Sequence, residues 1–294
     1  MPELPEVETV RMGLEPVLVG NRFASVEQRR KDLRFPFPVN FAKRLSGRTV
    51  EALDRRAKYL LARLDDGEVL VMHLGMTGRF SIDRANGEHI EPGEFYEDAP
   101  IAPPHEHIVF HMGDGAAVRY ADARRFGYMD LIRQSRLNEH ALFKGLGIEP
   151  LSDAFTPEWL ANRLKGKATS IKAALLDQRL IAGIGNIYAC EALYRAKISP
   201  LRLAKTLATK TGKPTEKTKA LVDSIKVVLG QAIKAGGSSL RDYRSAEGRL
   251  GRFQHSFKVY GREGKPCRGK GCSGTVRRIV QNGRSTFYCP ICQK

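Results

Sequence analysis

Residues 267–292, CRGKGCSGTVRRIVQNGRSTFYCPIC, decide the fold of the C-terminal end of this chain. They contain four of its five cysteines, spaced as Cys267-x4-Cys272 and Cys289-x2-Cys292. Two close pairs of thiols with 16 residues between them suit tetrahedral binding of one structural zinc ion. Two disulfides are the alternative. The acidic N-terminus is not a signal peptide, however, and disulfides are rare in the cytoplasm expected for such a chain.

A short hairpin is predicted inside this segment, from strands at residues 275–281 and 285–289. Asn282-Gly283 between them is the preferred dipeptide of a type I′ turn. Arg284 follows the turn directly, so a zinc-clipped hairpin would hold it rigidly near the tip. A solvated surface arginine is the ordinary interpretation, but two more arginines in the first strand favour a ribbon that faces nucleic acid.

The net charge of +17 is distributed unevenly along the 294 residues. Residues 151–294 contain 28 Lys and Arg against 9 Asp and Glu, a net charge of +19, whereas residues 1–150 contain 21 against 23, a net charge of −2. Charge that serves only solubility is usually mixed in sign and evenly spread. The imbalance therefore predicts that the second half binds a polyanion such as nucleic acid. No apolar run approaches the length of a membrane span.

Three parts are expected along the chain: a β-domain at residues 1–135, a helical domain at 150–250 and a zinc-finger hairpin at 258–294. In the helical part, Thr156-Pro157 is a good cap and first-turn pair for a helix. Further helices are predicted at residues 171–176, 187–196 and 216–235. Cys190, in one of these helices, is expected to be a buried packing residue.

The first half has the pattern of antiparallel strands. Two hairpins are predicted where turns containing glycine, at Asp65–Gly67 and Gly113–Gly115, separate apolar runs. Another apolar run covers residues 128–132, and residues 83–105, rich in Pro, Gly and acidic side chains, suit a long surface loop. The expected fold class is α+β and multidomain. An antiparallel β-sandwich or barrel with one N-terminal helix precedes a helical domain that ends in the zinc hairpin.

The first ten residues, MPELPEVETV, give the strongest chemical signal. If Met1 is removed, the chain begins with Pro2, a secondary amine, followed by the carboxylate of Glu3. Such an amine can attack an electrophilic sugar carbon and form an iminium, and an α-amino group is partly unprotonated at neutral pH. The alternative is that Pro5 and Glu6 simply open a helix.

Together these features resemble the formamidopyrimidine-DNA glycosylases, bifunctional repair enzymes also called 8-oxoguanine DNA glycosylases. The resemblance extends from end to end of the chain. The related endonuclease VIII group typically begins MPEGPE, so Leu4 favours the formamidopyrimidine branch. Six motifs in order support the resemblance: MPELPEVE at residues 1–8, RRAKYL at 55–60, HLGMTGRF at 73–80, ARRFG at 123–127, GIGNIYACEAL at 183–193 and RSTFYCPIC at 284–292.

The resemblance implies catalytic roles for four residues. Pro2 is similar to the nucleophile that attacks C1′ of the damaged nucleotide, and Glu3 is similar to the acid that protonates the sugar ring oxygen. Lys58 matches the proton donor for β-elimination, and Arg284 matches the donor for δ-elimination. Without the resemblance, nothing distinguishes Lys58 among the 49 basic residues.

The resemblance also implies contacts with DNA. The family fills the gap left by a flipped nucleotide with a Met, an Arg and a Phe, which match Met76, Arg124 and Phe126. Ordinary core packing is the alternative for the two apolar residues. Phosphate contacts are expected at three further matching positions: His105, Lys172 and Asn186. A glycine-rich turn into a helix N-terminus makes the last of these a plausible anion site in its own right.

One position departs from the family pattern. Some members have a basic DNA-contacting residue just before the position of Thr169, where this chain has Ala168. The contact is therefore assigned to Lys167, one residue earlier. The loop Ser238–Arg252 matches the segment that closes over the damaged base, but its sequence does not identify the contacts that determine specificity.

The leading hypothesis is a monomeric enzyme of base excision repair that acts on damaged double-stranded DNA in the cytoplasm, associated with the nucleoid. It would remove 8-oxoguanine and formamidopyrimidines through an imine on Pro2, and then cut the strand by β- and δ-elimination. Zinc is structural, and neither a nucleotide cofactor nor a membrane is expected. Two alternatives stay open: an endonuclease VIII-like glycosylase for oxidised pyrimidines, and a non-catalytic protein that binds damaged DNA. Retention of Met1 would block the imine, because the Pro2 nitrogen would then be an amide.

Overall fold

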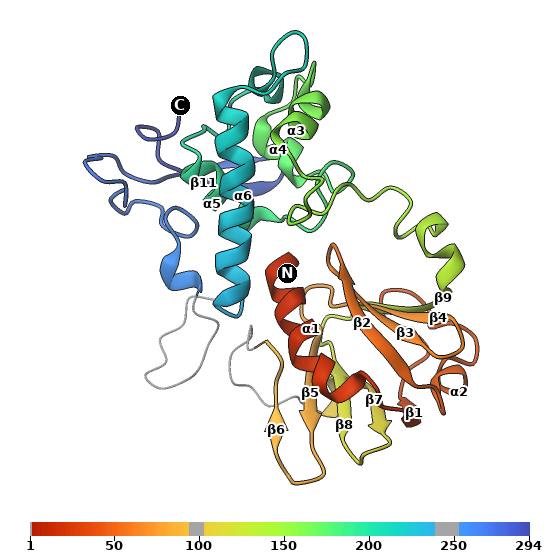
Figure 1. The fold of residues 1–294 in the computed structure, drawn as a ribbon. Coiled ribbons are helices and arrows are strands. Elements are labelled where there is room, and N and C mark those ends of the chain that lie inside the picture. The colour runs from red at the N-terminus through yellow and green to blue at the C-terminus, as the bar shows by residue number, and fades with distance from the viewer. Residues whose placement is uncertain (1, 94–102, 239–252) are drawn as a thin grey trace. The chain divides into compact units, whose positions relative to one another are not determined.

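The computed structural model describes residues 2–93, 103–238 and 253–294. The chain forms two compact units, each described here by itself (Figure 1). The first contains Met1–Lys144 and Ala235–Arg252, and the second contains Gly145–Lys234 and Phe253–Lys294. Met1, and all but the first residue of the loop expected to close over the damaged base, lie outside the described residues.

The first unit is a sandwich of two antiparallel sheets, with strand orders β2-β3-β4-β9 and β1-β7-β8-β5-β6. Apolar side chains from both sheets meet in one buried core, as for Leu60 of the first sheet and Phe110 of the second. This confirms the predicted β-sandwich. The strands are β1 (Phe23–Gln28), β2 (Val50–Arg56), β3 (Tyr59–Leu64), β4 (Glu68–His73), β5 (Arg79–Asp83), β6 (His89–Ile90), β7 (Glu106–Met112), β8 (Ala117–Ala121) and β9 (Tyr128–Arg133).

The two predicted glycine turns join β3 to β4 and β7 to β8, with φ of +76° at Gly67 and +89° at Gly115. The long surface loop predicted for residues 83–105 is wrong in part, because β6 lies within it and pairs with β5. Gly87, with φ of +84°, closes this small hairpin. Strand β6 contains only His89 and Ile90, which is too short for an alternation of apolar and polar residues to reveal it.

Among the described residues, two α-helices accompany the sandwich: α1 (Leu4–Leu18) and α2 (Phe41–Leu45). Helix α1 begins after Glu3, its N-cap residue, and has a proline in its first turn, as the sequence predicts. Val7, Val10 and Leu14 are buried at helical spacing. The helix lies against β2 and β3 (Figure 1), so the N-terminal residues are anchored to the first sheet.

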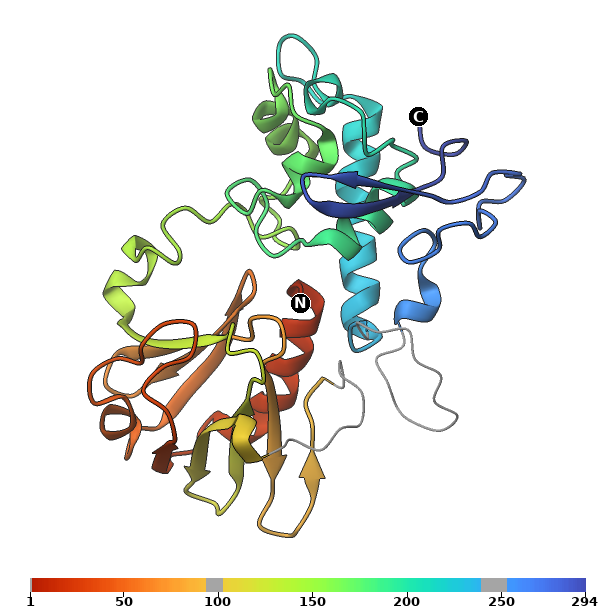
Figure 2. The ribbon, with the colours of Figure 1, turned by 180° about the vertical axis from the view of Figure 1, so that it is seen from behind.

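The second unit combines helices with one hairpin. Its helices are α3 (Pro157–Leu164), α4 (Ile171–Leu176), α5 (Asn186–Arg195) and α6 (Glu216–Lys234). Thr156 caps α3 as predicted, since its hydroxyl accepts a hydrogen bond from the Trp159 amide at 3.1 Å. The hairpin of β10 (Arg277–Gln281) and β11 (Arg284–Tyr288) crosses the helices (Figure 2), and α5 lies against both α6 and β11.

The turn of this hairpin is the predicted one. Gln281 pairs with Arg284, so Asn282 and Gly283 alone connect the strands, and their φ angles of +49° and +71° are those of a type I′ turn. Cys190 is buried against Val259 and Val276, which confirms its packing role.

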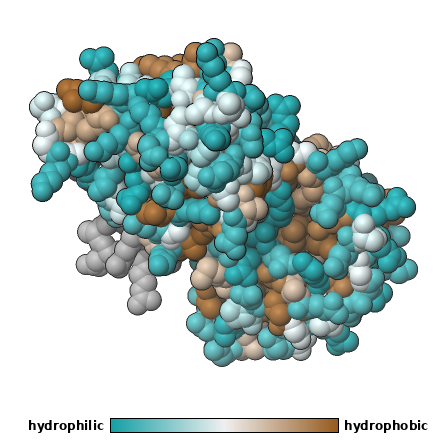
Figure 3. Space-filling view, turned by 45° about the horizontal axis from the view of Figure 1, so that its top comes forward, coloured by the Kyte–Doolittle hydropathy of each residue, from teal (hydrophilic) through white to brown (hydrophobic). Residues whose placement is uncertain are grey.

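Hydrophilic side chains cover much of the face shown in Figure 3, with hydrophobic areas between them. Within the described parts of the chain, no helix is both long enough and apolar enough to cross a membrane.

Candidate functional site

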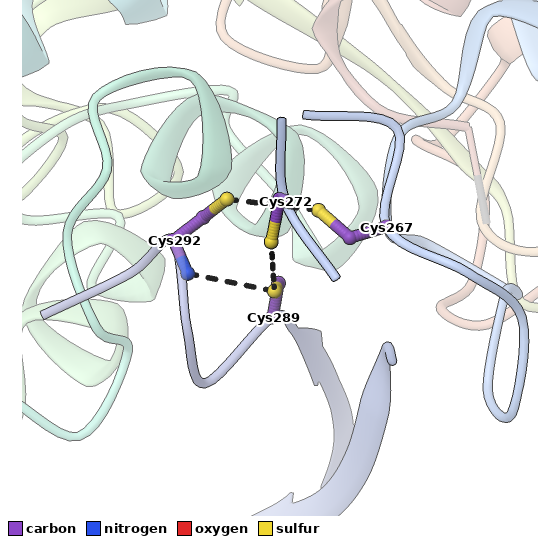
Figure 4. A group of neighbouring side chains, drawn as sticks. All are labelled: Cys267, Cys272, Cys289 and Cys292. Atoms are coloured by element: carbon purple, nitrogen blue, oxygen red, sulfur yellow. Dashed lines mark hydrogen bonds between the residues drawn. The ribbon is translucent and has the colours of Figure 1, made fainter. Parts of the chain in front are cut away.

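Four cysteine sulfurs converge beside the C-terminal hairpin (Figure 4), and all lie within 4.8 Å of one another. The sulfurs of Cys267 and Cys292 are 3.7 Å apart, as are those of Cys272 and Cys289. Tetrahedral zinc with Zn–S bonds of about 2.3 Å places its sulfur ligands about 3.8 Å apart. All five cysteines, each within the described residues, have free thiols. The geometry therefore fits one zinc ion rather than two disulfides.

Two glycines shape the loops that present these sulfurs. The amides of Gly269 and Gly274 each donate to a sulfur at 3.3 Å, of Cys267 and Cys272 respectively. A Cβ at Gly269 would come within 2.9 Å of a cysteine sulfur, and one at Gly274 within 2.8 Å. Glycine is therefore required at both positions, and N–H donors of this kind orient and stabilise thiolate ligands.

The N-terminal pair Pro2 and Glu3 is buried at the start of α1. The Glu3 amide donates to Glu6 Oε2 at 2.9 Å. The other oxygen of Glu6 accepts from the Ser238 amide at 2.9 Å and from its hydroxyl at 3.0 Å. Glu6 therefore does more than open the helix, because it fixes the backbone of Glu3 against a distant segment of the same unit. The three-residue spacing of a capping box is the signal that could have shown this.

Lys58 lies in the two-residue connection between β2 and β3, where it is 8% exposed. His73, at the end of β4, is a residue that the sequence analysis missed. Its ring stacks on Tyr128 at an angle of 13°, and its Nδ1 accepts a hydrogen bond from the Gly75 amide at 3.0 Å. Burial, and then the positive charges of Lys58 and Arg34, lower the pKa of His73 to about 4. The imidazole is therefore neutral at pH 7.

The loops that contain Met76, Arg124 and Phe126 are brought together in the first unit. Gly75, with φ of +61°, packs its backbone so closely that a Cβ there would lie 2.3 Å from the Gly127 nitrogen. The Arg124 guanidinium lies over the Phe126 ring, 4.7 Å from its centre. Phe126 is 41% exposed, so the core-packing alternative is wrong for it.

Asp122, another residue that the sequence analysis missed, connects these loops through hydrogen bonds to its buried carboxylate. It is 1% exposed, and one carboxylate oxygen accepts from the Thr77 hydroxyl and from the Arg124 amide. The other oxygen accepts from the Gly127 amide at 2.7 Å. The Asp122 amide donates to the His105 carbonyl at 3.0 Å, so His105 is connected to the same loops.

Lys172 and Asn186 converge in the second unit on the residue after Arg284. Lys172 is 1% exposed, and its ammonium donates to Thr286 Oγ1 at 2.6 Å and to the Ser285 carbonyl at 3.2 Å. The Asn186 amide donates to the same carbonyl at 2.9 Å. Both side chains thus support strand β11, and a phosphate contact at either residue stays a prediction.

A cavity of about 360 Å³ in the second unit lies beside the hairpin turn. Lys167, Arg179 and Arg284 line it, together with Asn282 of the turn. Arg179 pairs with Asp177 at 3.0 Å, which leaves the cavity a net positive lining. Arginine and lysine side chains grouped in this way suit a phosphate group. The structure therefore brings Lys167 and Arg284 together, although 116 positions separate them in the sequence.

Fold and site together define a protein with a β-sandwich, a helical domain and a zinc-binding hairpin. Three family models match consecutive parts of it. They describe a formamidopyrimidine-DNA glycosylase N-terminal domain (residues 1–129), a formamidopyrimidine-DNA glycosylase H2TH domain (residues 146–244) and a zinc finger found in FPG and IleRS (residues 264–294). The zinc-finger match and the sulfur geometry agree, so the four C-terminal cysteines form one structural zinc site.

Curated relatives match over the full length. A formamidopyrimidine-DNA glycosylase of Rhodopseudomonas palustris is 58% identical and one of Bradyrhizobium is 57% identical, each over 100% of both chains. Among solved structures, a mutant Lactococcus lactis FPG in complex with a Fapy-dG containing DNA has a TM-score of 0.82 and 35% identity over 100% of both chains. The Lactococcus lactis Fpg in complex with an abasic site containing DNA has a TM-score of 0.81 and 36% identity over 99% of both chains. The chain belongs to the formamidopyrimidine-DNA glycosylase family.

Proposed function

We propose that this chain is a DNA glycosylase and lyase of base excision repair that removes oxidised purines from duplex DNA. One observation supports this most directly: Glu3 and Lys58, the two side chains assigned to proton transfer, are 4% and 8% exposed in the same unit. Charged side chains are seldom buried this deeply, so the pair distinguishes this part of the unit as a candidate site. The related Lactococcus lactis proteins bound to Fapy-dG containing and abasic site containing DNA support the same substrates.

The chemistry begins at the Pro2 amine once Met1 has been removed. The amine attacks C1′ of the damaged nucleotide, the bond from C1′ to the base breaks, and the base leaves with a proton. Glu3 protonates the ring oxygen, so that the sugar opens and an iminium forms at C1′. Loss of a C2′ proton then expels the 3′ phosphate with Lys58 as proton donor. A second elimination, in which a C4′ proton is lost, expels the 5′ phosphate from C5′ with Arg284 as proton donor.

The DNA is proposed to be held by two groups of residues. Arg124 and Phe126, which stack on each other, and the neighbouring Met76 would fill the space left by the flipped nucleotide. The cavity lined by Lys167 and Arg284 would hold a backbone phosphate. One copy of the chain supplies all of these groups, so we propose that it acts as a monomer, on nucleoid DNA in the cytoplasm.

Oxidised pyrimidines are a second candidate substrate class. A further matched structure is a complex between wild-type Lactococcus lactis FPG and an oxidized pyrimidine containing DNA. Comparison of single-turnover excision on duplexes with 8-oxoguanine and with thymine glycol would rank the two classes. Faster excision of thymine glycol would overturn the proposed preference for purines.

Borohydride trapping tests the central proposal. Protein whose N-terminus has been sequenced is incubated with a duplex containing one 8-oxoguanine opposite cytosine, and the reduced adduct is counted. We expect a covalent adduct from protein that begins at Pro2, and none from a Pro2→Gly variant that still binds the duplex. Undiminished trapping by that variant would refute the role of Pro2. Binding without any adduct from the wild type would favour the non-catalytic alternative.

A further inference from the structure

The turn that presents Lys58 is strained. Arg56 pairs with Tyr59, so Ala57 and Lys58 alone connect β2 to β3. A two-residue hairpin turn with a positive φ at its first position alone is of the II′ type, in which that position is usually glycine. Here Ala57 occupies that position with φ of +54° and is 1% exposed. A residue with a Cβ adopts this conformation at a cost in free energy, so contacts around the turn must stabilise it.

Arg55 supplies such a contact. Its Nη1 donates to the Ala57 carbonyl at 2.9 Å, and its Nε donates to Glu8 Oε2, also at 2.9 Å. The side chain of Arg55 is only 10% exposed, so water screens these interactions weakly. The Ala57 carbonyl belongs to the peptide that leads into Lys58. Its hydrogen bond therefore fixes the orientation of the peptide plane between Ala57 and Lys58, and with it the direction of the Lys58 side chain.

Glu8 connects this contact to helix α1. Its second oxygen accepts from Arg11 Nε at 2.8 Å, and Arg11 also donates to the Leu53 carbonyl of β2 at 3.1 Å. Glu8 thus has an arginine on each oxygen, which fixes its carboxylate in one orientation. It lies on α1, five positions after the N-cap residue Glu3. One chain of hydrogen bonds therefore runs from the helix that directly follows Pro2 and Glu3 to the turn that presents Lys58.

We propose that Glu8 and Arg55 are positioning residues that hold Lys58 in register with the N-terminal amine for strand cleavage. The proposal rests on the role of Lys58 given under Proposed function. Neither residue is placed in contact with substrate, so neither takes part in forming the imine. Their loss should therefore slow β-elimination while leaving imine formation nearly intact. A general structural role would instead slow both steps together.

The experiment uses the full-length zinc-bound protein and a duplex with one abasic site. Borohydride trapping reports the imine, and single-turnover strand cleavage reports β-elimination. Arg55→Ala should slow cleavage by about ten- to a hundredfold, the size expected for a catalytic group misplaced by up to an ångström. Its trapping rate should change by no more than about twofold, as for a step that needs no group from the turn. Glu8→Gln should also slow cleavage more than trapping, but by a smaller factor than Arg55→Ala, because an amide can still accept from Arg55.

Two further variants make the result specific. Arg55→Lys should recover part of the cleavage rate, since one ammonium can reach the Ala57 carbonyl but cannot also form the fork with Glu8. Arg63→Ala is the matched control, because Arg63 of β3 pairs with Asp54 of β2 at 2.6 Å on an exposed face. This control should cleave and trap as the wild type does.

The outcomes separate the two proposals. No adduct from wild-type protein that begins at Pro2 would overturn the proposed function and this inference with it. Normal cleavage by Lys58→Ala would refute the role of Lys58, on which the inference depends. Impaired cleavage by Lys58→Ala with normal cleavage by Arg55→Ala would refute the positioning role alone. Equal losses of trapping and cleavage in a folded Arg55→Ala protein would also refute it.

Discussion

Asp122 lies beneath a loop whose own side chains are exposed. Its carboxylate accepts from two backbone amides, of Arg124 and Gly127, and from a hydroxyl on the neighbouring loop. Amides that point at one buried carboxylate fix the path of the chain between them. Arg124 and Phe126 can therefore remain at the surface in a defined position. The residues proposed to contact DNA are thus held in place by a carboxylate that the solvent does not reach.

His73 leads to a prediction about pH. Because burial lowers the pKa of His73 to about 4, the unfolded chain binds more protons than the folded one between this value and the ordinary value of 6.5. The contribution of neutral His73 to the free energy of unfolding should therefore be fully present above pH 6.5 and decrease as the pH is lowered toward 4. We expect a loss of roughly 2 kcal/mol in the free energy of unfolding between pH 7 and pH 5 from this residue. Denaturation of the wild type and of His73→Gln at both pH values measures it. The same pH dependence in the variant would contradict the assignment.

The hairpin of β10 and β11 is stabilised by more than its zinc site. Glu191 of α5 is 4% exposed, and its carboxylate accepts from the amides of residues 258, 259 and 260 at 2.8–2.9 Å. Burial raises the pKa of this carboxyl, while the three amides oppose that effect. The segment leading to Cys267 is therefore attached to a helix before it reaches the first cysteine.

Zinc affinity should depend on the glycines between the cysteines. Gly274→Ala places a Cβ 2.8 Å from the Cys289 sulfur, so we expect the thiolates to separate and zinc affinity to fall at least tenfold, as for other disturbed ligand surroundings. DNA binding should weaken with it. Competition with a chelating dye measures the first effect, and fluorescence anisotropy with a labelled duplex measures the second.

Gly230→Ala is the control for that substitution. Gly230 lies within α6, and among the described residues nothing comes within 4 Å of the Cβ that alanine would add. Both zinc affinity and DNA affinity should remain those of the wild type. Full zinc affinity in Gly274→Ala, measured beside this control, would show that the close approach does not constrain the site.

Across the whole molecule, the charge imbalance predicts a strong dependence of DNA affinity on salt. Each phosphate neutralised releases counterions, so the logarithm of affinity falls linearly with the logarithm of salt concentration. Lys167→Ala should reduce this slope by about 1, because it removes the phosphate contact proposed at the basic cavity. Lys219→Ala is the comparison, since Lys219 already pairs with Glu216 at 2.8 Å. Titrations at four salt concentrations measure the slopes. Equal slopes for Lys167→Ala and the wild type would show that Lys167 does not contact a phosphate.

Local patterns in the sequence predicted much of this molecule. Asn282-Gly283 predicted its turn and Thr156 its helix cap, because turn and cap chemistry acts over a few residues. The spacing of the cysteines predicted the zinc site for the same reason. The resemblance supplied the rest of the candidate site, since no local pattern distinguishes Lys58 from other basic residues.

The supporting contacts could not be predicted from the sequence. Arg55 and Glu8 are 47 positions apart, and Asp122 and Thr77 are 45 apart, so their meeting depends on the completed sandwich. Lys172 donates to residues 285 and 286 of β11, a contact that nothing in its sequence surroundings indicates. A lysine in a short helix gives no local sign of whether it faces solvent or a strand more than a hundred residues away.

The close backbone contact between Gly75 and Gly127 limits which substitutions these two loops can accept. A Cβ at Gly75 would lie 2.3 Å from the Gly127 nitrogen, and a Cβ at Gly127 would lie 2.7 Å from the His73 carbonyl oxygen. A residue with a Cβ at either position would displace the neighbouring loop. The two backbones are therefore expected to change only together. Diversity can enter only through neighbouring side chains such as Met76 and Phe126. Substitutions can thus change the side chains proposed to fill the opened duplex while the backbone that supports them stays the same.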